Sequence, residues 1–200
     1  AISSRFVTRE DIAAVVPAFD CGATIGRVVA GARRFLADVV VVSDGSRDET
    51  AAAALAAGAR VEVLPQNHGK GFALRRGIEL ALERQPRALV LLDGDGQHDP
   101  GDIPALLAAW DGGGADLIVG ARLQDSGRIP TARFWTNYIG TRILTWMSEL
   151  QLEDSQSGYR LISSALVRRM RLRSDGYAIE TEMLIKAGKS GARVGHVPVR

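Results

Sequence analysis

Residues 88–100 read ALVLLDGDGQHDP, and their pattern is the clearest indication of the fold class. Its first part, 88–92, is a continuous apolar run with the length of a strand that is buried on both faces. Asp93 ends the run, and Asp99 followed by Pro100 predicts a helix start, with the aspartate as N-cap and the proline at the first helical position. A buried strand, a polar turn and a helix in this order are typical of a parallel α/β sheet.

The same alternation of predicted strands and helices extends to both sides of this stretch. Strands are predicted at 12–19, 39–43, 60–64 and 116–120, and helices at 23–36, 46–57, 71–84 and 99–110. Ser46 and Glu49 are predicted to form a capping box for the second of these helices. The alternation predicts a doubly wound, mostly parallel α/β sheet.

The regular alternation of strands and helices ends after Arg122. A polar loop leads to a predicted helix at 132–150, a short strand at 158–162 and helices at 163–170 and 177–188. We therefore expect one domain over residues 1–200. The first half resembles a nucleotide-binding sheet, and the C-terminal half is expected to be a helical elaboration that holds something else.

The composition is that of a globular protein without a bulk attraction for nucleic acid. The chain has 46% hydrophobic residues, and 25 basic residues balance 23 acidic ones. A single cysteine, Cys21, excludes an intrachain disulfide and a cysteine-based zinc site. No apolar stretch approaches the roughly 18 residues that span a bilayer, and the first residues lack the apolar core of a secretory signal. We expect a cytoplasmic protein with no nucleic-acid partner.

Positive charge is concentrated in residues 128–173, which hold eight arginines against three acidic residues. Either this is a solvated helical surface, or it is a face that meets an anionic substrate or anionic lipid. The predicted helix at 132–150 also carries Trp135, Tyr138 and Trp146, which either pack in the core or lie at a membrane interface. Any membrane contact of the given chain is expected to be peripheral, unless a membrane segment follows it.

Polar side chains follow each strand predicted in the first half, at the edge where ligands bind in open α/β sheets. Asp93 and Asp95 come directly after a buried strand, and Gln97 adds a third oxygen donor. Such a pair of carboxylates can share one Mg²⁺ or Mn²⁺ with the phosphate oxygens of a ligand. The alternative is an ordinary aspartate-rich turn.

Two further turns are candidates for nucleotide contacts. Residues 67–71 combine glycines with Lys70 and so allow a phosphate to approach, but Gly71 stands where a P-loop has Ser or Thr. Asp44 either hydrogen-bonds a base or ribose or orients the turn before the next helix. No G-x-G-x-x-G follows the first strand, which disfavours a dinucleotide dehydrogenase. His98, like the other two histidines, is interpreted as a loop or surface residue.

Five motifs, taken in order along the chain, resemble the pattern of glycosyltransferase family 2. They are Val15–Phe19, Ser43–Thr50, Asn67–Ala73, Asp93–Pro100 and Asp154–Arg160. The resemblance is strongest to the dolichyl- and polyprenyl-phosphate sugar synthases. Two positions depart from the family pattern: Asp20-Cys21 replaces a common Asn-Glu, and Ser43 replaces a common Asp.

The resemblance implies a GT-A fold in which residues 1–122 bind a nucleotide-diphosphate sugar of the GDP-mannose or UDP-glucose type and residues 123–200 form the acceptor side. It implies an inverting transfer with Mg²⁺ or Mn²⁺ to a polyprenyl phosphate at the cytoplasmic face of a membrane. The expected catalytic residues are Asp93 and Asp95, and the metal ligands are Asp93, Asp95 and Gln97. The expected donor-binding residues are Pro17, Ala18, Asp20, Asp44, Ser46, Lys70, Asp93 and Arg122.

A lipid phosphate acceptor is already anionic near neutral pH, so basic groups rather than a general base must position it. The expected acceptor-binding residues are Arg122, Arg133, Arg142 and Arg160.

Three other functions remain open. A saccharide hydroxyl as acceptor needs a carboxylate base, and the Glu180-Thr181-Glu182 stretch offers one, unless these acids only stabilise a helix N-terminus. Residues 91–96 also resemble the nucleophile motif of haloacid-dehalogenase-like phosphohydrolases, but that motif lies on the first strand and usually includes Thr. A non-catalytic binding module would fit the two departures, although the intact Asp93 and Asp95 argue against it.

Overall fold

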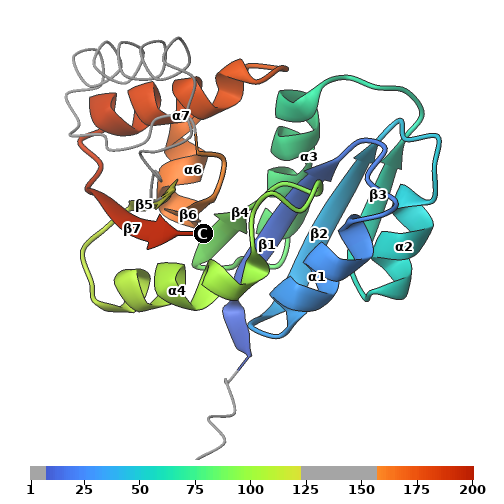
Figure 1. Cartoon of the computed structure of the whole chain (residues 1–200). Coiled ribbons are helices and arrows are strands. Elements are labelled where there is room, and N and C mark those ends of the chain that lie inside the picture. The colour runs from blue at the N-terminus through green and yellow to red at the C-terminus, as the bar shows by residue number, and fades with distance from the viewer. Residues whose placement is uncertain (1–7, 123–156) are drawn as a thin grey trace, which may run out of the picture.

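The computed structural model of the chain describes residues 8–122 and 157–200, which contain one seven-stranded sheet of order β3-β2-β1-β4-β6-β5-β7 (Figure 1). The strands are β1 (Arg9–Ala18), β2 (Leu36–Asp44), β3 (Arg60–Leu64), β4 (Ala88–Leu91), β5 (Leu117–Arg122), β6 (Arg160–Ser163) and β7 (Val194–Val199). The helices are α1 (Ile25–Arg33), α2 (Thr50–Ala56), α3 (Lys70–Leu82), α4 (Ile103–Asp111), α6 (Ser164–Met170) and α7 (Ala178–Lys189), with a 3-10 turn, η1 (Pro100–Asp102), in front of α4.

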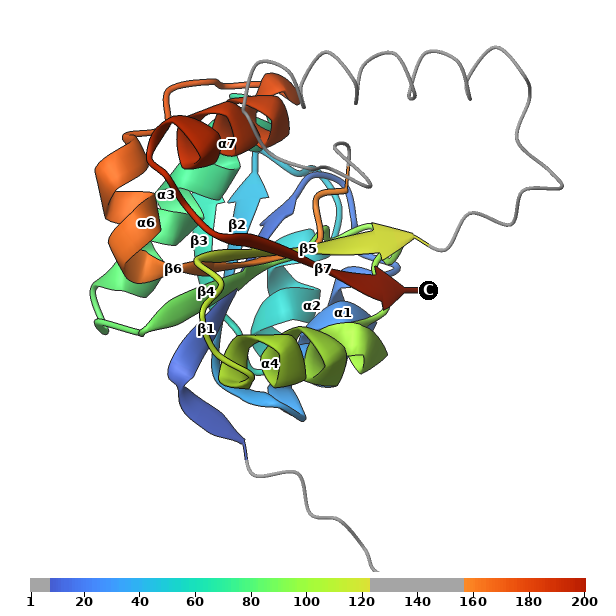
Figure 2. The ribbon, with the colours of Figure 1, turned by 90° about the vertical axis from the view of Figure 1, so that its left-hand side faces the viewer.

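Helices cover both faces of the sheet, which is why β4 and residues 12–18 of β1 are continuous runs of buried apolar residues. Helices α1, α2 and α4 lie on one face, and α3, α6 and α7 lie on the other (Figures 1 and 2). Along β1 the side chains alternate between two cores. Ile12 and Ala14 belong to the core that includes α1 and α4, whereas Ala13 and Val15 belong to the core that includes α3 and α7.

Strand β6 brings the second half of the chain into the middle of the sheet. It pairs antiparallel with both β4 and β5, and the other strand pairs of the described sheet are parallel. Arg160 at the start of β6 lies opposite Leu91 at the end of β4. The residues before β6 therefore reach the same sheet edge as the turns that follow the parallel strands.

Most predicted elements of the described region are confirmed, with shifted ends. Strand β7 has no counterpart among the predicted strands, because Gly195 and Pro198 interrupt its apolar pattern. Pro198 pairs with Ala121 on an edge strand, where proline is tolerated because one side of the strand needs no ladder hydrogen bond.

The predicted capping box is wrong, because α2 begins at Thr50 and its N-cap makes no side-chain hydrogen bond. Asp48 instead accepts a hydrogen bond from the Thr50 amide at 3.0 Å. The predicted Asp99 cap is confirmed, since its carboxylate accepts a hydrogen bond from the Gly101 amide at 2.7 Å. The predicted helix at 132–150, with its aromatic side chains, lies outside the described residues.

Across residues 8–122 and 157–200, every helix is too short or too polar to cross a bilayer.

Candidate functional site

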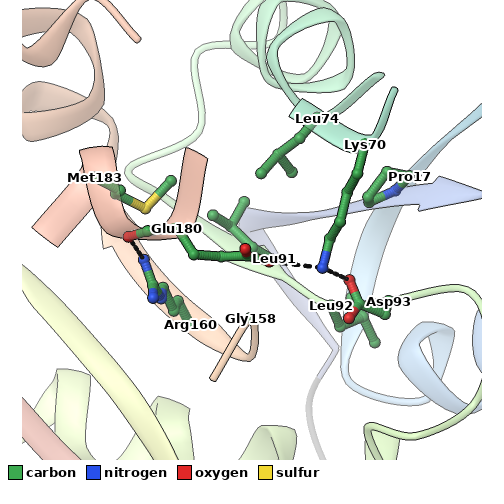
Figure 3. Close-up of a pocket in the computed structure, with 10 residues that line it drawn as sticks. All are labelled: Pro17, Lys70, Leu74, Leu91, Leu92, Asp93, Gly158, Arg160, Glu180 and Met183. Atoms are coloured by element: carbon green, nitrogen blue, oxygen red, sulfur yellow. Dashed lines mark hydrogen bonds and ion pairs between the residues drawn. The ribbon is translucent and has the colours of Figure 1, made fainter. Parts of the chain in front are cut away.

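A small pocket lies at the carboxyl end of β4, between the two halves of the chain (Figure 3). It is lined by Pro17, Lys70, Leu74, Leu91, Leu92, Asp93, Gly158, Arg160, Glu180 and Met183. The first six residues come from β1, α3 and the end of β4. The last four come from the start of β6 and from α7. This position agrees with the expectation that ligands bind outside the carboxyl ends of the strands.

Lys70 links the two sides of this pocket. Its ammonium nitrogen Nζ lies 2.8 Å from Oδ1 of Asp93 and 2.6 Å from Oε1 of Glu180 (Figure 3). Burial of the ammonium lowers the pKa of Lys70, but the two carboxylates act more strongly in the opposite direction, so this pKa is raised above its ordinary value. Lys70 is therefore a cation at neutral pH. Its Nζ also lies 5.7 Å from the centre of the Tyr177 ring, which is within the range of a cation–π contact.

The turn after β4 is fixed to the second half of the chain through His98. The Asp93 amide donates a hydrogen bond to Nδ1 of His98 at 3.1 Å, and the His98 ring stacks on Tyr159. The Tyr159 hydroxyl in turn donates to the carbonyl of Asp99 at 3.0 Å, and burial raises the pKa of this phenol. His98 lies on a loop, as predicted, but it is only 3% exposed and therefore is not a surface residue. No local pattern in the sequence indicates that His98 is buried against Tyr159.

Asp95 and Gln97 lie on the exposed part of the same turn. Oδ1 of Asp95 accepts a hydrogen bond from the Gln97 amide at 2.9 Å, which holds the two residues together. The turn sits close over β1, because a Cβ on Gly94 would lie 3.1 Å from Cβ of Ala18. Asp93, the third predicted ligand, stands at the start of this turn.

The described residues contain no ready-made cluster of three or more His, Cys, Asp or Glu that could hold a metal. Carboxylate and amide oxygens are nevertheless the donors that Mg²⁺ and Mn²⁺ prefer, and Mg²⁺ usually binds through one or two carboxylates with phosphate oxygens and water. The exposed Asp95 and Gln97 next to Asp93 fit an ion of this kind when a diphosphate completes its shell.

Asp44 orients a turn, but a different one from the turn that the sequence suggested. Its oxygens accept hydrogen bonds from the amides of His68 and Gly69, each at 2.8 Å, and the residue is 2% exposed. The carboxylate thus shapes the loop that leads into α3 and places Lys70.

The glycine-rich start of α3 packs against the segment 171–177 of the second half. The amides of Gly71 and Phe72 both donate to the carbonyl of Asp175, at 2.7 and 3.1 Å. Arg75 strengthens this contact through its own ion pair with Asp175 at 2.6 Å. Within the turn 67–71 that was predicted to approach a phosphate, the Gly71 amide is therefore directed at the chain's own backbone.

The turns after β1 and β2 are joined to each other. The Asp20 amide donates to the Ser46 hydroxyl at 3.1 Å, and the Asp20 carboxylate accepts from the Arg47 amide at 2.8 Å. Pro17 lines the pocket and Ala18 ends β1, so these predicted donor-binding residues lie along the same sheet edge.

Arg160 lines the pocket but is 1% exposed. Its Nε donates to the Ser157 carbonyl and its Nη1 donates to the Glu180 carbonyl, both at 2.8 Å. The guanidinium thus fixes the first turn of α7 to the start of β6. Arg122 ends β5, but its side chain, like the whole of Arg133 and Arg142, lies outside what the structure describes.

The two acidic residues suggested as a base have different surroundings. Glu180 reaches Lys70 in the pocket, whereas Glu182 accepts hydrogen bonds from the Ser174 amide at 2.8 Å and from Lys186 at 2.6 Å. Burial disfavours the charge on Glu182, but these hydrogen bonds outweigh it and lower the pKa of Glu182 to about 2. Glu182 therefore anchors segment 171–177, and only Glu180 belongs to the site.

Residues 13–173 match the model of the family described as "Glycosyl transferase family 2". The undecaprenyl-phosphate mannosyltransferase of Micrococcus luteus is 34% identical over 173 residues, which cover 81% of this chain and 70% of the relative. The polyprenol monophosphomannose synthase of Mycolicibacterium smegmatis is 31% identical, and the match covers 80% of this chain and 65% of that protein.

A solved structure of glucosyl-3-phosphoglycerate synthase from Mycobacterium tuberculosis, in complex with Mn²⁺, UDP and glucosyl-3-phosphoglycerate, has the same fold. The two structures align with a TM-score of 0.73 at 23% identity, over 95% of this chain and 70% of that one.

Proposed function

The chain belongs to glycosyl transferase family 2 and has the GT-A fold, and from this premise we propose that it transfers a sugar from a nucleotide-diphosphate sugar to a polyprenyl phosphate. One observation carries the proposal. The Asp93–Gln97 turn, with its exposed Asp95, stands at the carboxyl end of β4 directly beside the Lys70 cation. Relatives that are 31% and 34% identical are named for mannose transfer to such lipids, which favours this acceptor class.

The donor's diphosphate would lie over the turn after β4. Asp93, Asp95 and Gln97 would hold a Mg²⁺ or Mn²⁺ ion, which when bound neutralises the charge that develops on the leaving diphosphate. Lys70 adds a cation beside Asp93 that does not depend on the metal. The nucleoside side of the donor would be lined by Pro17, Ala18, Asp20 and Ser46. Asp44 would act indirectly, by holding the loop that places Lys70.

In the proposed reaction, the bond between the anomeric carbon and the diphosphate oxygen breaks, and the diphosphate keeps the electron pair. An oxygen of the acceptor phosphate forms the new bond from the opposite face, so the configuration inverts. That oxygen is already anionic, and therefore no general base is required. The short contact of Glu180 with Lys70 agrees with this, because Glu180, a carboxylate from the second half that lines the pocket, is engaged with a cation.

On the acceptor side, Arg122, Arg133 and Arg142 would position the lipid phosphate, with Arg160 supporting α7 from within. The acceptor's long apolar chain stays in a bilayer, so we propose a peripheral contact with the cytoplasmic face of the membrane. The positive charge of residues 128–173 is suited to such a surface.

The test is a transfer assay with labelled GDP-mannose and, separately, labelled UDP-glucose. The purified chain is mixed with a polyprenyl phosphate in detergent, with Mn²⁺ or with a chelator. We expect label in the organic phase only when the divalent ion is present. Label confined to a water-soluble glycan would instead establish a saccharide acceptor. Hydrolysis of a generic phosphate ester without sugar transfer would favour the phosphohydrolase.

A further inference from the structure

The carboxylate of Glu180 is held in place from two sides. Its own backbone carbonyl is bound by the buried guanidinium of Arg160 at 2.8 Å, which fixes the first turn of α7. Gly158 leaves room for the side chain, since a Cβ there would lie 3.3 Å from Oε1 of Glu180 and 3.4 Å from Nζ of Lys70. The carboxylate therefore meets Lys70 at 2.6 Å as part of the packed structure (Figure 3).

Lys70 shares one positive charge between two carboxylates. Asp93 at 2.8 Å is also a proposed metal ligand, whereas Glu180 at 2.6 Å is not. If Asp93 were the sole anionic partner, a divalent ion would have to compete with the ammonium for the same carboxylate. The ion would also repel that ammonium. A second carboxylate on the far side of Lys70 removes this conflict.

We propose that Glu180 is a positioning residue of the donor site, which retains the Lys70 ammonium in the pocket while Asp93 binds the metal and its diphosphate. This inference rests on the proposed function. Glu180 acts through Lys70, so its contribution disappears when Lys70 carries no charge. A direct electrostatic attraction between Glu180 and the ion would persist without Lys70, and this difference makes the two roles separable.

The experiment is a double-mutant cycle on Mn²⁺ affinity, measured by electron paramagnetic resonance in the presence of GDP and, separately, UDP. Glu180→Gln keeps the shape of the side chain and removes its charge. We expect it to weaken Mn²⁺ binding on the order of tenfold. In the Lys70→Met background, the same Glu180→Gln change should leave the Mn²⁺ affinity unaltered.

Two further variants support this design. Glu79→Gln removes an exposed carboxylate from α3, the helix that carries Lys70, and should bind Mn²⁺ as the wild type does. Glu180→Asp keeps the negative charge but shortens the side chain by one methylene, so the carboxylate lies further from Lys70. This variant should give an intermediate loss of Mn²⁺ affinity. It also provides the measurement if the glutamine variant fails to fold.

Three results would overturn the inference. Wild-type Mn²⁺ affinity in both Glu180 variants would show that the carboxylate does not matter. An equal loss with and without Lys70 would assign it a direct electrostatic role. Absence of nucleotide-dependent Mn²⁺ binding by the wild type would remove the metal-dependent donor site itself, and with it the proposed function.

Discussion

The two walls of the pocket differ in how their polar groups are used. The first wall, from α3 and the turn after β4, ends in the exposed Asp95, whose Oδ1 accepts a hydrogen bond from the backbone amide of Gln97. The second wall, from β6 and α7, holds Arg160 at 1% exposure and directs Glu180 at Lys70. In the proposed function, the first wall supplies the groups that bind the donor, and the second wall supports and positions them.

Removal of Asp95 breaks the first wall alone and should have the largest effect. Asp95→Asn keeps the size of the side chain but removes the charge that we propose binds the metal, so we expect sugar transfer to fall by at least about 10²-fold. The melting temperature should barely change, because exposed side chains contribute little to stability. Asp111→Asn, an exposed aspartate at the end of α4, is the matched control and should keep full activity. Turnover of Asp95→Asn near the wild-type level would refute the metal assignment.

A methyl group at Gly71 breaks the junction between the walls. Its Cβ would lie 2.7 Å from the carbonyl carbon of Asp175 and 2.8 Å from the Gly176 oxygen, and these backbone atoms cannot move without disturbing segment 171–177. We expect Gly71→Ala to lower the free energy of unfolding by about 3 kcal/mol, measured with urea. Gly26→Ala in α1, where the nearest atom is at 3.6 Å, should be neutral or stabilising. Equal stability of the two variants would mean that the junction is loose.

The anchoring of segment 171–177 by Glu182 can be tested at low pH. The pKa of Glu182 is lowered from 4.5 to about 2 in the folded chain, so its stabilisation is complete above pH 4.5 and is lost as the pH falls through about 2. Glu182→Gln should cost about 2 kcal/mol at neutral pH and should lose less stability than the wild type over this acid range. Unfolding followed by circular dichroism at several pH values measures both. Parallel pH profiles would contradict the anchoring role.

The smallest effect is expected where the two walls touch at Gly158. The Cβ of an alanine would crowd Glu180, Lys70 and His98 at 3.3 to 3.4 Å, and two of these neighbours can yield at their flexible ends. We expect Gly158→Ala to cost about 1 kcal/mol and to weaken nucleotide-dependent Mn²⁺ binding about fivefold. Gly176→Ala, with no atom within 4 Å of its Cβ, serves as the control in the same titration. Identical affinities would show that the contact is not tight.

The first wall could be predicted from sequence because each of its features depends on neighbouring residues. The apolar run before Asp93 predicts a buried strand, and the alternation of Asp and Gly predicts an exposed polar turn. The strands of the first half and the placement of their polar ends are accordingly confirmed.

The second wall could not be predicted in the same way. The roles of Gly158, Arg160 and Glu180 depend on β6 pairing antiparallel between β4 and β5, and no local pattern specifies which strands become neighbours. Arg160 illustrates the difference: in the sequence it adds to a cationic segment, but in the fold it is buried and binds two backbone carbonyls.

The position of β6 also sets the order in which the molecule can be completed. Strand β4 has β1 on one side, and its other side stays without a partner until residues 160–163 have left the ribosome. During that interval the nascent chain exposes an apolar strand edge that can pair with other chains. Closure of the sheet around β6 is a contact between distant segments and is expected to be a slow step of folding. Productive folding therefore depends on the arrival of the same segment that completes the pocket.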